Sequence, residues 1–243
     1  MRSILLLIII FSNNTIALDV NVTELKNKNP ERVLYIGNSY LYYNDSLHNH
    51  VRRMLEEEYL KEIDTTNYKM VTISGSRLPH HNIEYPLNHK NLGAEKPFEL
   101  VILQGGSGEA NTVDERNDFS IEAKAMIKKI HEAGAEAALY MIHAYVKPHE
   151  NTDPEMIKNI KKMYIDAANQ NSVLVMPVGI AFENAYEKNP DIVLHKEYDG
   201  SHPSLLGTYL AACVVFSSIT HKSPLQIQSV SYTHLTLPTT RHV

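Results

Sequence analysis

Five short apolar runs are spaced along the chain, and stretches with helical periodicity separate them. The runs are Val33–Ile36, Met70–Ile73, Leu100–Leu103, Ala138–Ile142 and Val173–Met176. Short, nearly continuous apolar runs are typical of strands that are covered on both faces of a parallel sheet. The alternation of strand and helix predicts a doubly wound α/β fold: a three-layer α/β/α sandwich around a mostly parallel five-stranded sheet.

Three helices are predicted between the runs, because each helical pattern has a capping signal at one end. They are Leu47–Ile63 behind the capping cluster Asn44-Asp45-Ser46, Phe119–Ala133 before Gly134, and Pro154–Asn169 behind Asp153. Such helices serve as the crossover connections that parallel strands require.

A further helix is predicted near the end of the chain. Pro203 suits the first position of a helix, where its missing N–H costs nothing. The residues after it recur at three- and four-residue intervals and form a buried stripe: Leu205, Leu206, Tyr209, Leu210, Cys213, Val214 and Phe216. We expect this helix to pack into the core and to hold His202 at its start. Cys213 is the only cysteine, which excludes an intrachain disulfide and favours a small buried hydrophobe.

The first residues of the chain differ from the rest. Residues 1–18 combine Arg2, the apolar run Ile4–Phe11 and the small-residue exit Thr15-Ile16-Ala17, a pattern typical of a secretory signal peptide. The run is too short to span a bilayer, although a buried strand is an alternative interpretation. We therefore expect a secreted or periplasmic protein with no stable membrane span after processing, and one domain over residues 19–229.

The last residues also stand apart. Residues 230–239 read Val-Ser-Tyr-Thr-His-Leu-Thr-Leu-Pro-Thr, which resembles a translated sequencing adapter. We interpret residues 230–243 as a non-native tail, with a genuine Thr-rich tail as the alternative.

Composition excludes some classes of function. The chain has 243 residues, of which 43% are hydrophobic, and this suffices for one sizeable core. Its formal net charge is −5 and its pI is about 6.2, so it has no basic surplus with which to neutralise phosphates. Nucleic acid is therefore not an expected partner, and the sequence does not indicate an oligomeric state.

Residues that can carry chemistry follow the predicted strands. Beyond the first four strands, in chain order, come Ser39, Gly75, Gln104 and His143, and Asp199 and His202 precede the last helix. In open α/β sheets, ligands bind outside the carboxyl ends of the strands. We expect these residues to meet in one site.

Three of these residues form a plausible catalytic set. A serine nucleophile needs a base within hydrogen-bond reach, and a third group must orient that base. The sequence predicts Ser39 as the nucleophile, His202 as the base and Asp199 as the orienting carboxylate. Taken singly, Ser39 and Asp199 would more often be helix caps, but their conjunction with His202 favours chemistry.

Three segments resemble the characteristic blocks of the SGNH/GDSL hydrolases. Ile36-Gly37-Asn38-Ser39-Tyr40 resembles the nucleophile block, Ser74-Gly75-Ser76-Arg77-Leu78 the glycine block, and Asp199-Gly200-Ser201-His202-Pro203-Ser204 the closing D-x-x-H block. The resemblance implies a flavodoxin-like SGNH hydrolase fold and hydrolysis of carboxylic esters through an acyl-enzyme. It also implies that the backbone N–H groups of Ser39 and Gly75 belong to the oxyanion hole.

The sequence departs from these blocks at two places. The family usually has a third oxyanion donor, an Asn in a Gly-x-Asn block, where this chain reads Gln104-Gly105-Gly106-Ser107. Gln104 is our first candidate for that donor, and Asn111 is the alternative. Asn38 replaces the commonest Asp of the nucleophile block and is expected to support the turn.

Rival sites are weaker. Gly105-Gly106-Ser107-Gly108 nearly forms a nucleophile elbow around Ser107, but Glu109 takes the place of the final Gly. The same run lacks the Gly-Lys-Ser/Thr ending of a phosphate-binding loop. The 13 His residues form no H-E-x-x-H motif and have no Cys partners, so neither a metal site nor a cofactor is expected.

The substrate is less well defined than the reaction. Tyr40, His80 and His143 lie near strand ends and are candidates for substrate binding, and Tyr42 and Tyr43 are candidates for a rim. The first hypothesis is an exported esterase acting on small or carbohydrate-borne esters, with a carbohydrate acetyl-esterase preferred. The alternatives are a short-chain lipase or lysophospholipase, and a non-catalytic carbohydrate-binding protein on the same fold.

Overall fold

The five apolar runs form one parallel sheet in the computed structural model, which describes residues 19–227. Its strands are β1 (Val33–Gly37), β2 (Tyr68–Thr72), β3 (Leu100–Leu103), β4 (Glu136–Tyr140) and β5 (Leu174–Met176). They lie in the order β2-β1-β3-β4-β5, and every neighbouring pair is parallel. This is the flavodoxin-like order, in which the chain changes direction across the sheet between β1 and β3.

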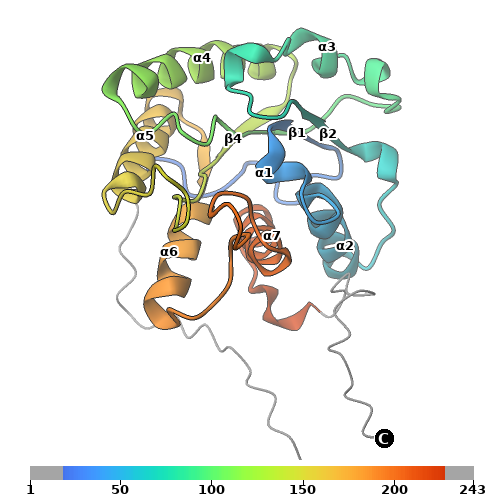
Figure 1. Ribbon diagram of the computed structural model, residues 1–243. Helices are drawn as coiled ribbons and strands as arrows, with labels where there is room; N and C mark the ends of the chain where they lie inside the picture. Colours follow the sequence, from blue (N-terminus) through green and yellow to red (C-terminus); the bar gives the residue numbers. More distant parts are fainter. Residues whose placement is uncertain (1–18, 228–243) are drawn as a thin grey trace, which may run out of the picture.

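Helices cover both faces of the sheet, so the predicted three-layer α/β/α architecture is confirmed (Figure 1). The helices are α1 (Ser39–Tyr42), α2 (Leu47–Tyr59), α3 (Glu84–Leu87), α4 (Val113–Glu132), α5 (Met156–Asn171), α6 (Val178–Lys188) and α7 (Leu205–Thr220). Helices α2, α6 and α7 lie on one side, and α4 and α5 lie on the other. Short 3₁₀ turns occupy Thr65–Asn67, Leu78–His80, His89–Leu92 and Pro224–Gln226.

Burial explains the pattern of the strands. All residues of β1, β3 and β5 are buried, whereas four of the five residues of β2 are half-buried. β2 is an edge strand that pairs only with β1, so one of its sides is not covered by a neighbour.

Several predicted helix boundaries are wrong. α4 begins at Val113 rather than Phe119, with the Thr112 side chain accepting a hydrogen bond from the Glu115 N–H. Apart from Val113, the residues before Phe119 are polar, so no apolar periodicity marks the start of the helix. α7 begins at Leu205, so Pro203 lies outside the helix and forms an isolated bridge with His195.

Two capping predictions also fail. Asn44, Asp45 and Ser46 all have positive φ, and Ser46 makes no side-chain capping bond to α2. α5 begins at Met156, so Asp153 and Pro154 lie before the helix.

The predicted signal peptide at residues 1–18 and the predicted tail lie outside the described residues, as do residues 228 and 229 of the predicted domain. Among the helices that the structure describes, none is long and apolar enough to cross a membrane.

Candidate active site

A hydrogen-bonded relay joins three side chains beyond the carboxyl end of β1. The Ser39 Oγ lies 2.9 Å from the His202 Nε2, and the His202 Nδ1 lies 2.8 Å from the Asp199 Oδ2. A carboxylate only accepts hydrogen bonds, so Nδ1–H donates to Asp199 and leaves Nε2 to accept from the Ser39 hydroxyl. The structure therefore brings together the three residues of the predicted catalytic set, in the tautomer that a general base requires.

The loop that carries Asp199 and His202 is fixed at both ends. The Val146 N–H donates to the Gly200 O at 2.9 Å, and the Ser204 N–H donates to the Leu194 O at 2.8 Å. Ser204 also caps α7, because its Oγ accepts from the Gly207 N–H at 3.1 Å. Gly200 has a φ of +63°, and a Cβ there would lie 2.0 Å from the Val146 O. Only glycine fits this approach.

Asn38 holds the turn on which Ser39 sits. Its Oδ1 accepts from the Tyr40 N–H at 3.1 Å, and its Nδ2 donates to the Ser76 O at 3.0 Å and to the Gly105 O at 3.2 Å. One buried side chain thus connects the segments that follow β1, β2 and β3. This is the supporting role expected for Asn38.

Gln104 supports the turn that carries Ser39 from beneath. The prediction of its amide as the third oxyanion donor is not supported. The side chain is fully buried, and its Oε1 accepts from the Asn38 N–H at 2.9 Å. Its Nε2 donates to the Gly105 O. Both ends of the amide therefore have a partner within the scaffold. Asn111, the alternative, is exposed in the turn that follows Gly108.

The two backbone donors remain available. Ser39 is the first residue of α1, so its N–H has no acceptor within the helix. Gly75 is exposed at a φ of +66°, and its N–H donates to no group among the described residues. Ser76 fixes the loop, because its Oγ lies 3.1 Å from the Gly37 O and 2.9 Å from the His81 Nε2.

The electrostatics of Asp199 suit its role. Partial burial acts to raise its pKa, but the N–H groups of Ser201 and His202 and the imidazole together outweigh burial, so the pKa lies below its usual value. The Asp199 Oδ1 accepts from the Ser201 N–H at 2.8 Å and from the His202 N–H at 3.0 Å. Asp199 thus remains ionised and can stabilise an imidazolium.

Two tyrosine rings hold the imidazole of His202. Tyr43 stacks on it with the centroids 4.3 Å apart and the planes at 19°, and Tyr40 meets it edge-on at 5.9 Å. The Lys196 Nζ lies 5.9 Å from the centroid of Tyr43. The tyrosines after Ser39 suggest a rim, but nothing in the sequence indicates that Tyr43 packs against the base.

The candidate substrate-binding residues lie in different surroundings. Tyr40 is only 2% exposed and His143 is fully buried, so neither forms an open substrate surface. The two rings stack at 4.3 Å, and both side chains bond Ser201, the Tyr40 OH to its Oγ and the His143 Nε2 to its backbone O, at 2.8 Å each. Tyr40 and His143 therefore support the loop that carries His202, and their prediction as substrate-binding residues is corrected. His80 is exposed, and its Nδ1 accepts from the Arg77 N–H at 3.1 Å.

Glu109 is a buried carboxylate that the sequence did not single out. It accepts from the Gly106 N–H, and its Oε1 lies 4.0 Å from the Arg77 Nε. Arg77 also pairs with Glu115. Burial raises the pKa of Glu109 to about 7, against the opposing effects of Gly106 and Arg77. Glu109 thus connects the loop after β3 to the segment that follows Gly75.

Ser107 has a different set of partners from Ser39. Its hydroxyl interacts with the hydroxyls of Tyr40 and Tyr145. Within residues 19–227 no imidazole is hydrogen-bonded to it, so it lacks the base that a serine nucleophile needs. The same residues include no group of three or more His, Cys, Asp or Glu side chains placed to hold a metal ion.

Comparisons with known proteins agree with this geometry at the level of the fold. No protein-family model and no curated protein sequence matches the chain. A candidate SGNH hydrolase from Slackia heliotrinireducens matches at a TM-score of 0.59 and 21% identity, over 79% of this chain and 100% of that one. A DUF4886 family protein from Bacteroides uniformis matches at a TM-score of 0.62 and 19% identity, over 82% of this chain and 86% of that one.

An enzyme of stated activity is also among the similar structures. A variant of an acetyl xylan esterase from Geobacillus stearothermophilus matches at a TM-score of 0.56 and 14% identity, over 77% of this chain and 94% of that one. At these identities the likeness concerns the fold alone. The chain has the SGNH hydrolase fold, as its motifs predicted.

Proposed function

We propose that the protein is a serine esterase that hydrolyses carboxylic esters through an acyl-enzyme on Ser39. The observation that carries the proposal is the relay from Ser39 through His202 to Asp199, with bonds of 2.9 and 2.8 Å. The relay lies at the sheet's switch point, where ligands of doubly wound folds bind.

The proposed reaction follows from the positions of these groups. The Ser39 Oγ attacks the ester carbonyl while the His202 Nε2 takes its proton, and Asp199 stabilises the imidazolium that forms. The N–H groups of Ser39 and Gly75 are the proposed donors to the oxyanion, whose charge develops as the carbonyl becomes tetrahedral. The imidazolium then protonates the departing alcohol, and a water molecule activated by His202 releases the acid.

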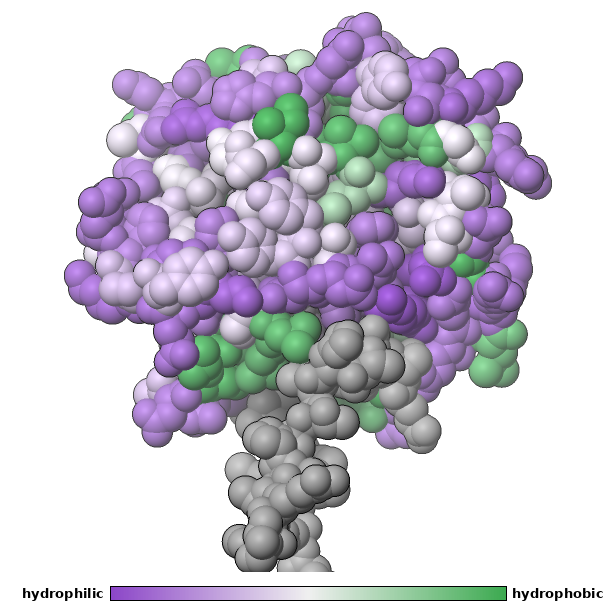
Figure 2. All heavy atoms as spheres, turned by 45° about the vertical axis from the view of Figure 1, so that its right-hand side comes forward, coloured by the Kyte–Doolittle hydropathy of each residue, from purple (hydrophilic) through white to green (hydrophobic). Residues whose placement is uncertain are grey.

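We infer that the natural substrate is an acetyl ester carried by a carbohydrate. Two acetyl xylan esterases are among the similar structures. The face seen in Figure 2 is mostly hydrophilic, and its hydrophobic residues lie in several separate patches. A polar surface suits a hydrated polysaccharide better than a lipid aggregate. The export expected from residues 1–18 would bring the enzyme to such a polymer.

A short-chain lipase is the second candidate, because apolar side chains lie exposed near the site. Ile73 is 46% exposed next to the Ser74-Gly75 turn, and Tyr42, in the same short helix as Ser39, is 36% exposed. The Tyr42 hydroxyl bonds the Ser74 Oγ at 3.3 Å. Such a border suits an acyl chain longer than acetyl.

A panel of p-nitrophenyl esters of rising chain length, together with acetylated xylan, tests both candidates. We expect hydrolysis of p-nitrophenyl acetate, release of acetate from xylan, and loss of most activity in Ser39→Ala and in His202→Ala. The double variant is expected to be little worse than either single one, because the members of the relay act as a unit. A maximum at a short acyl chain longer than acetyl would favour the lipase. Binding of xylan without turnover of any ester would indicate a carbohydrate-binding protein.

A further inference from the structure

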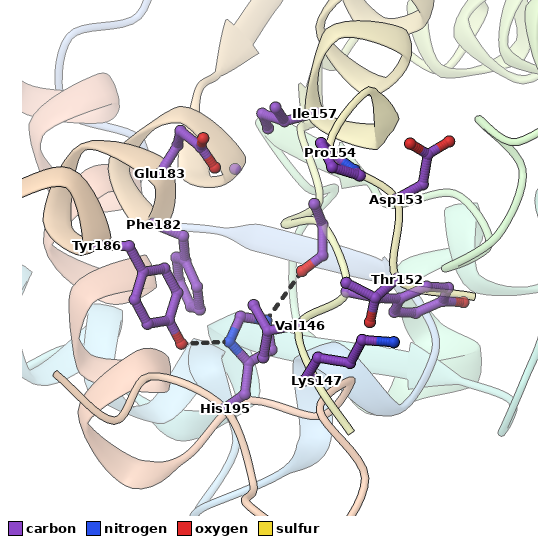
Figure 3. A pocket seen from close by; sticks show the side chains of 13 residues that line it. Val146, Lys147, Thr152, Asp153, Pro154, Ile157, Phe182, Glu183, Tyr186 and His195 are labelled. Atoms are coloured by element: carbon purple, nitrogen blue, oxygen red, sulfur yellow. Dashed lines mark hydrogen bonds between the residues drawn. The ribbon is translucent and has the colours of Figure 1, made fainter. Parts of the chain in front are cut away.

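A pocket lies against the loop that follows β4, which is hydrogen-bonded through Val146 to the loop that carries Asp199 and His202. It has a volume of about 220 Å³ and lies between the segment before α5, the helix α6 and His195 (Figure 3). We call it the α5–α6 pocket. Buried rings form its floor, and half-buried or exposed polar side chains lie around it: the rings are Tyr145, Phe182 and His195, and the polar residues include Lys147, Asp153 and Glu183.

The floor is fixed by hydrogen bonds within the protein. The His195 Nε2 donates to the Ala144 O at 3.0 Å, and its Nδ1 accepts from the Tyr186 OH at 2.7 Å (Figure 3). Both nitrogens of this buried imidazole are thus used, and the ring is neutral. The floor therefore offers rigid ring surfaces rather than a free titrating group.

The charged side chains around the pocket, unlike His195, keep groups that are open to a ligand. Glu183 on α6 is half-buried, and within residues 19–227 its carboxylate has neither a hydrogen-bond donor nor a cationic partner. Lys147 is exposed across the pocket from it, and no carboxylate in the same residues pairs with its ammonium group. Asp153 uses Oδ1 to accept from the Glu155 N–H at 2.9 Å. The oxygens of the Glu183 carboxylate are thus open to accept hydrogen bonds from a ligand with hydroxyl groups.

These features point to a small polyhydroxylated ligand. An anion would face the carboxylates of Asp153 and Glu183, and an apolar ligand would leave Glu183 desolvated without a partner. A small cation would be attracted by the two carboxylates and opposed by Lys147 alone, and the titration with ethanolamine tests this alternative. A sugar ring offers hydroxyls to the carboxylates and the ammonium group, and its C–H face can pack on aromatic rings. Drug-sized ligands occupy pockets of roughly 300–1,000 Å³, so 220 Å³ suits a single sugar unit.

A hydrogen bond and a series of ring contacts connect the pocket with the relay. Val146 lines the pocket, and its N–H donates to the Gly200 O next to Asp199 at 2.9 Å. The ring of His195 lies 4.7 Å from that of His143, which stacks on Tyr40 at 4.3 Å. Tyr40 in turn meets His202 at 5.9 Å. Three ring contacts therefore separate the floor of the pocket from the catalytic imidazole.

We propose that the α5–α6 pocket binds one sugar unit of the glycan whose ester reacts at Ser39, and thereby selects carbohydrate esters over simple ones. The inference rests on the proposed esterase function. It assigns the recognition of the alcohol part of the substrate to the loop after β4 and to α6, apart from the groups that perform the chemistry.

Variants of the pocket test this assignment on two substrates. Glu183→Ala is expected to raise KM for acetylated xylo-oligosaccharides about tenfold with kcat retained, and so to lower the preference for these over p-nitrophenyl acetate by the same factor. Lys147→Ala is expected to act in the same direction. Asn184→Ala is the control, because Asn184 lies on the same helix, is exposed and does not line the pocket. An equal loss on both substrates, or no change on the glycan, would overturn the proposal.

Direct binding separates this proposal from the esterase itself. Calorimetry with xylotriose on the Ser39→Ala protein is expected to show saturable binding that Glu183→Ala weakens about tenfold. Absence of that binding, or binding of ethanolamine instead, contradicts a sugar subsite even if the esterase is active. If the wild-type protein hydrolyses no ester, the proposed function fails, and with it the role of the pocket in selecting a substrate, whatever the xylotriose titration shows.

Discussion

Asn38 shows how one side chain places the proposed nucleophile without taking part in the chemistry. Its three hydrogen bonds connect the segments that follow β1, β2 and β3, and its own N–H is held by Gln104. The sequence predicted that Asn38 supports the turn. It could not predict that Gln104 lies below the turn, because the direction of a buried side chain depends on packing partners far away in the chain.

Tyr43 is expected to position His202. Replacing it with Ala should lower kcat about two- to tenfold, because a stacked aromatic pair contributes roughly 0.5–1.5 kcal/mol beyond the area it buries. KM should change little, and Tyr43→Phe should restore most of the loss because it keeps the ring. The measurement is the Michaelis kinetics of p-nitrophenyl acetate hydrolysis.

Tyr85→Ala is the control for this variant, since Tyr85 is an exposed tyrosine on α3 and the ring contacts of His202 are with Tyr40 and Tyr43. If Tyr43→Phe is as impaired as Tyr43→Ala, the stacking account is wrong and the hydroxyl is what matters.

At the scale of elements, the sequence predicted the strands well and the helix ends poorly. Strands β1 and β3 consist of buried residues, so their apolar runs nearly coincide with their bounds. α6 was missed, and α7 starts two residues beyond the predicted position. Pro203 was expected at the first helical position, but the helix begins at Leu205 and Ser204 caps it. A capping residue can be identified with certainty only when the geometry of its side chain is known.

Ser204→Ala should lower the free energy of unfolding by about 1 kcal/mol, because it removes the side-chain acceptor for the Gly207 N–H. The Ser204 hydroxyl also donates to the Val193 O at 2.7 Å. Urea denaturation measures the change. Ser218→Ala serves as the comparison, since its hydroxyl bonds the Val214 O within the same helix and its loss is expected to change stability by less than about 0.5 kcal/mol. Equal effects of the two substitutions would refute the capping role.

At the scale of the whole molecule, the order of the strands determines where the candidate active site lies. Because β1 and β3 are neighbours at the switch point, ligands of such a sheet bind beyond their carboxyl ends, and the strand-end rule applied to the sequence predicts the position of the relay. The strand order itself depends on contacts between distant parts of the chain. The stacking of Tyr40 on His143 arises in the same way, which is why the sequence alone suggests substrate contacts for these two residues.

Stability of the whole chain should fall on acidification because of buried histidines. Burial lowers the pKa of His195 to about 4, below the 6.5 of an unperturbed histidine. The folded chain then binds fewer protons than the unfolded chain between these values, so stability is complete above pH 6.5 and is lost as the pH falls through this window. Burial also lowers the pKa of His143.

His195→Gln should therefore reduce the difference in unfolding free energy between pH 7 and pH 5 by up to roughly 2 kcal/mol. Urea titrations at the two pH values measure that difference. His131→Gln changes an exposed histidine on α4 and should leave it nearly unchanged. If the His195 variant and the wild type show the same pH dependence, His195 does not contribute to the loss of stability on acidification.

The most direct measurement of the central claim is the site of covalent modification by a fluorophosphonate. This reagent reacts with a serine that a neighbouring base has activated, and mass spectrometry of the digested protein identifies the residue. We expect one adduct, on Ser39, that is absent in Ser39→Ala, almost absent in His202→Ala, and unchanged in Ser107→Ala. An adduct on Ser107, or a labelled protein in which Ser39 has been replaced by Ala, would contradict the central claim.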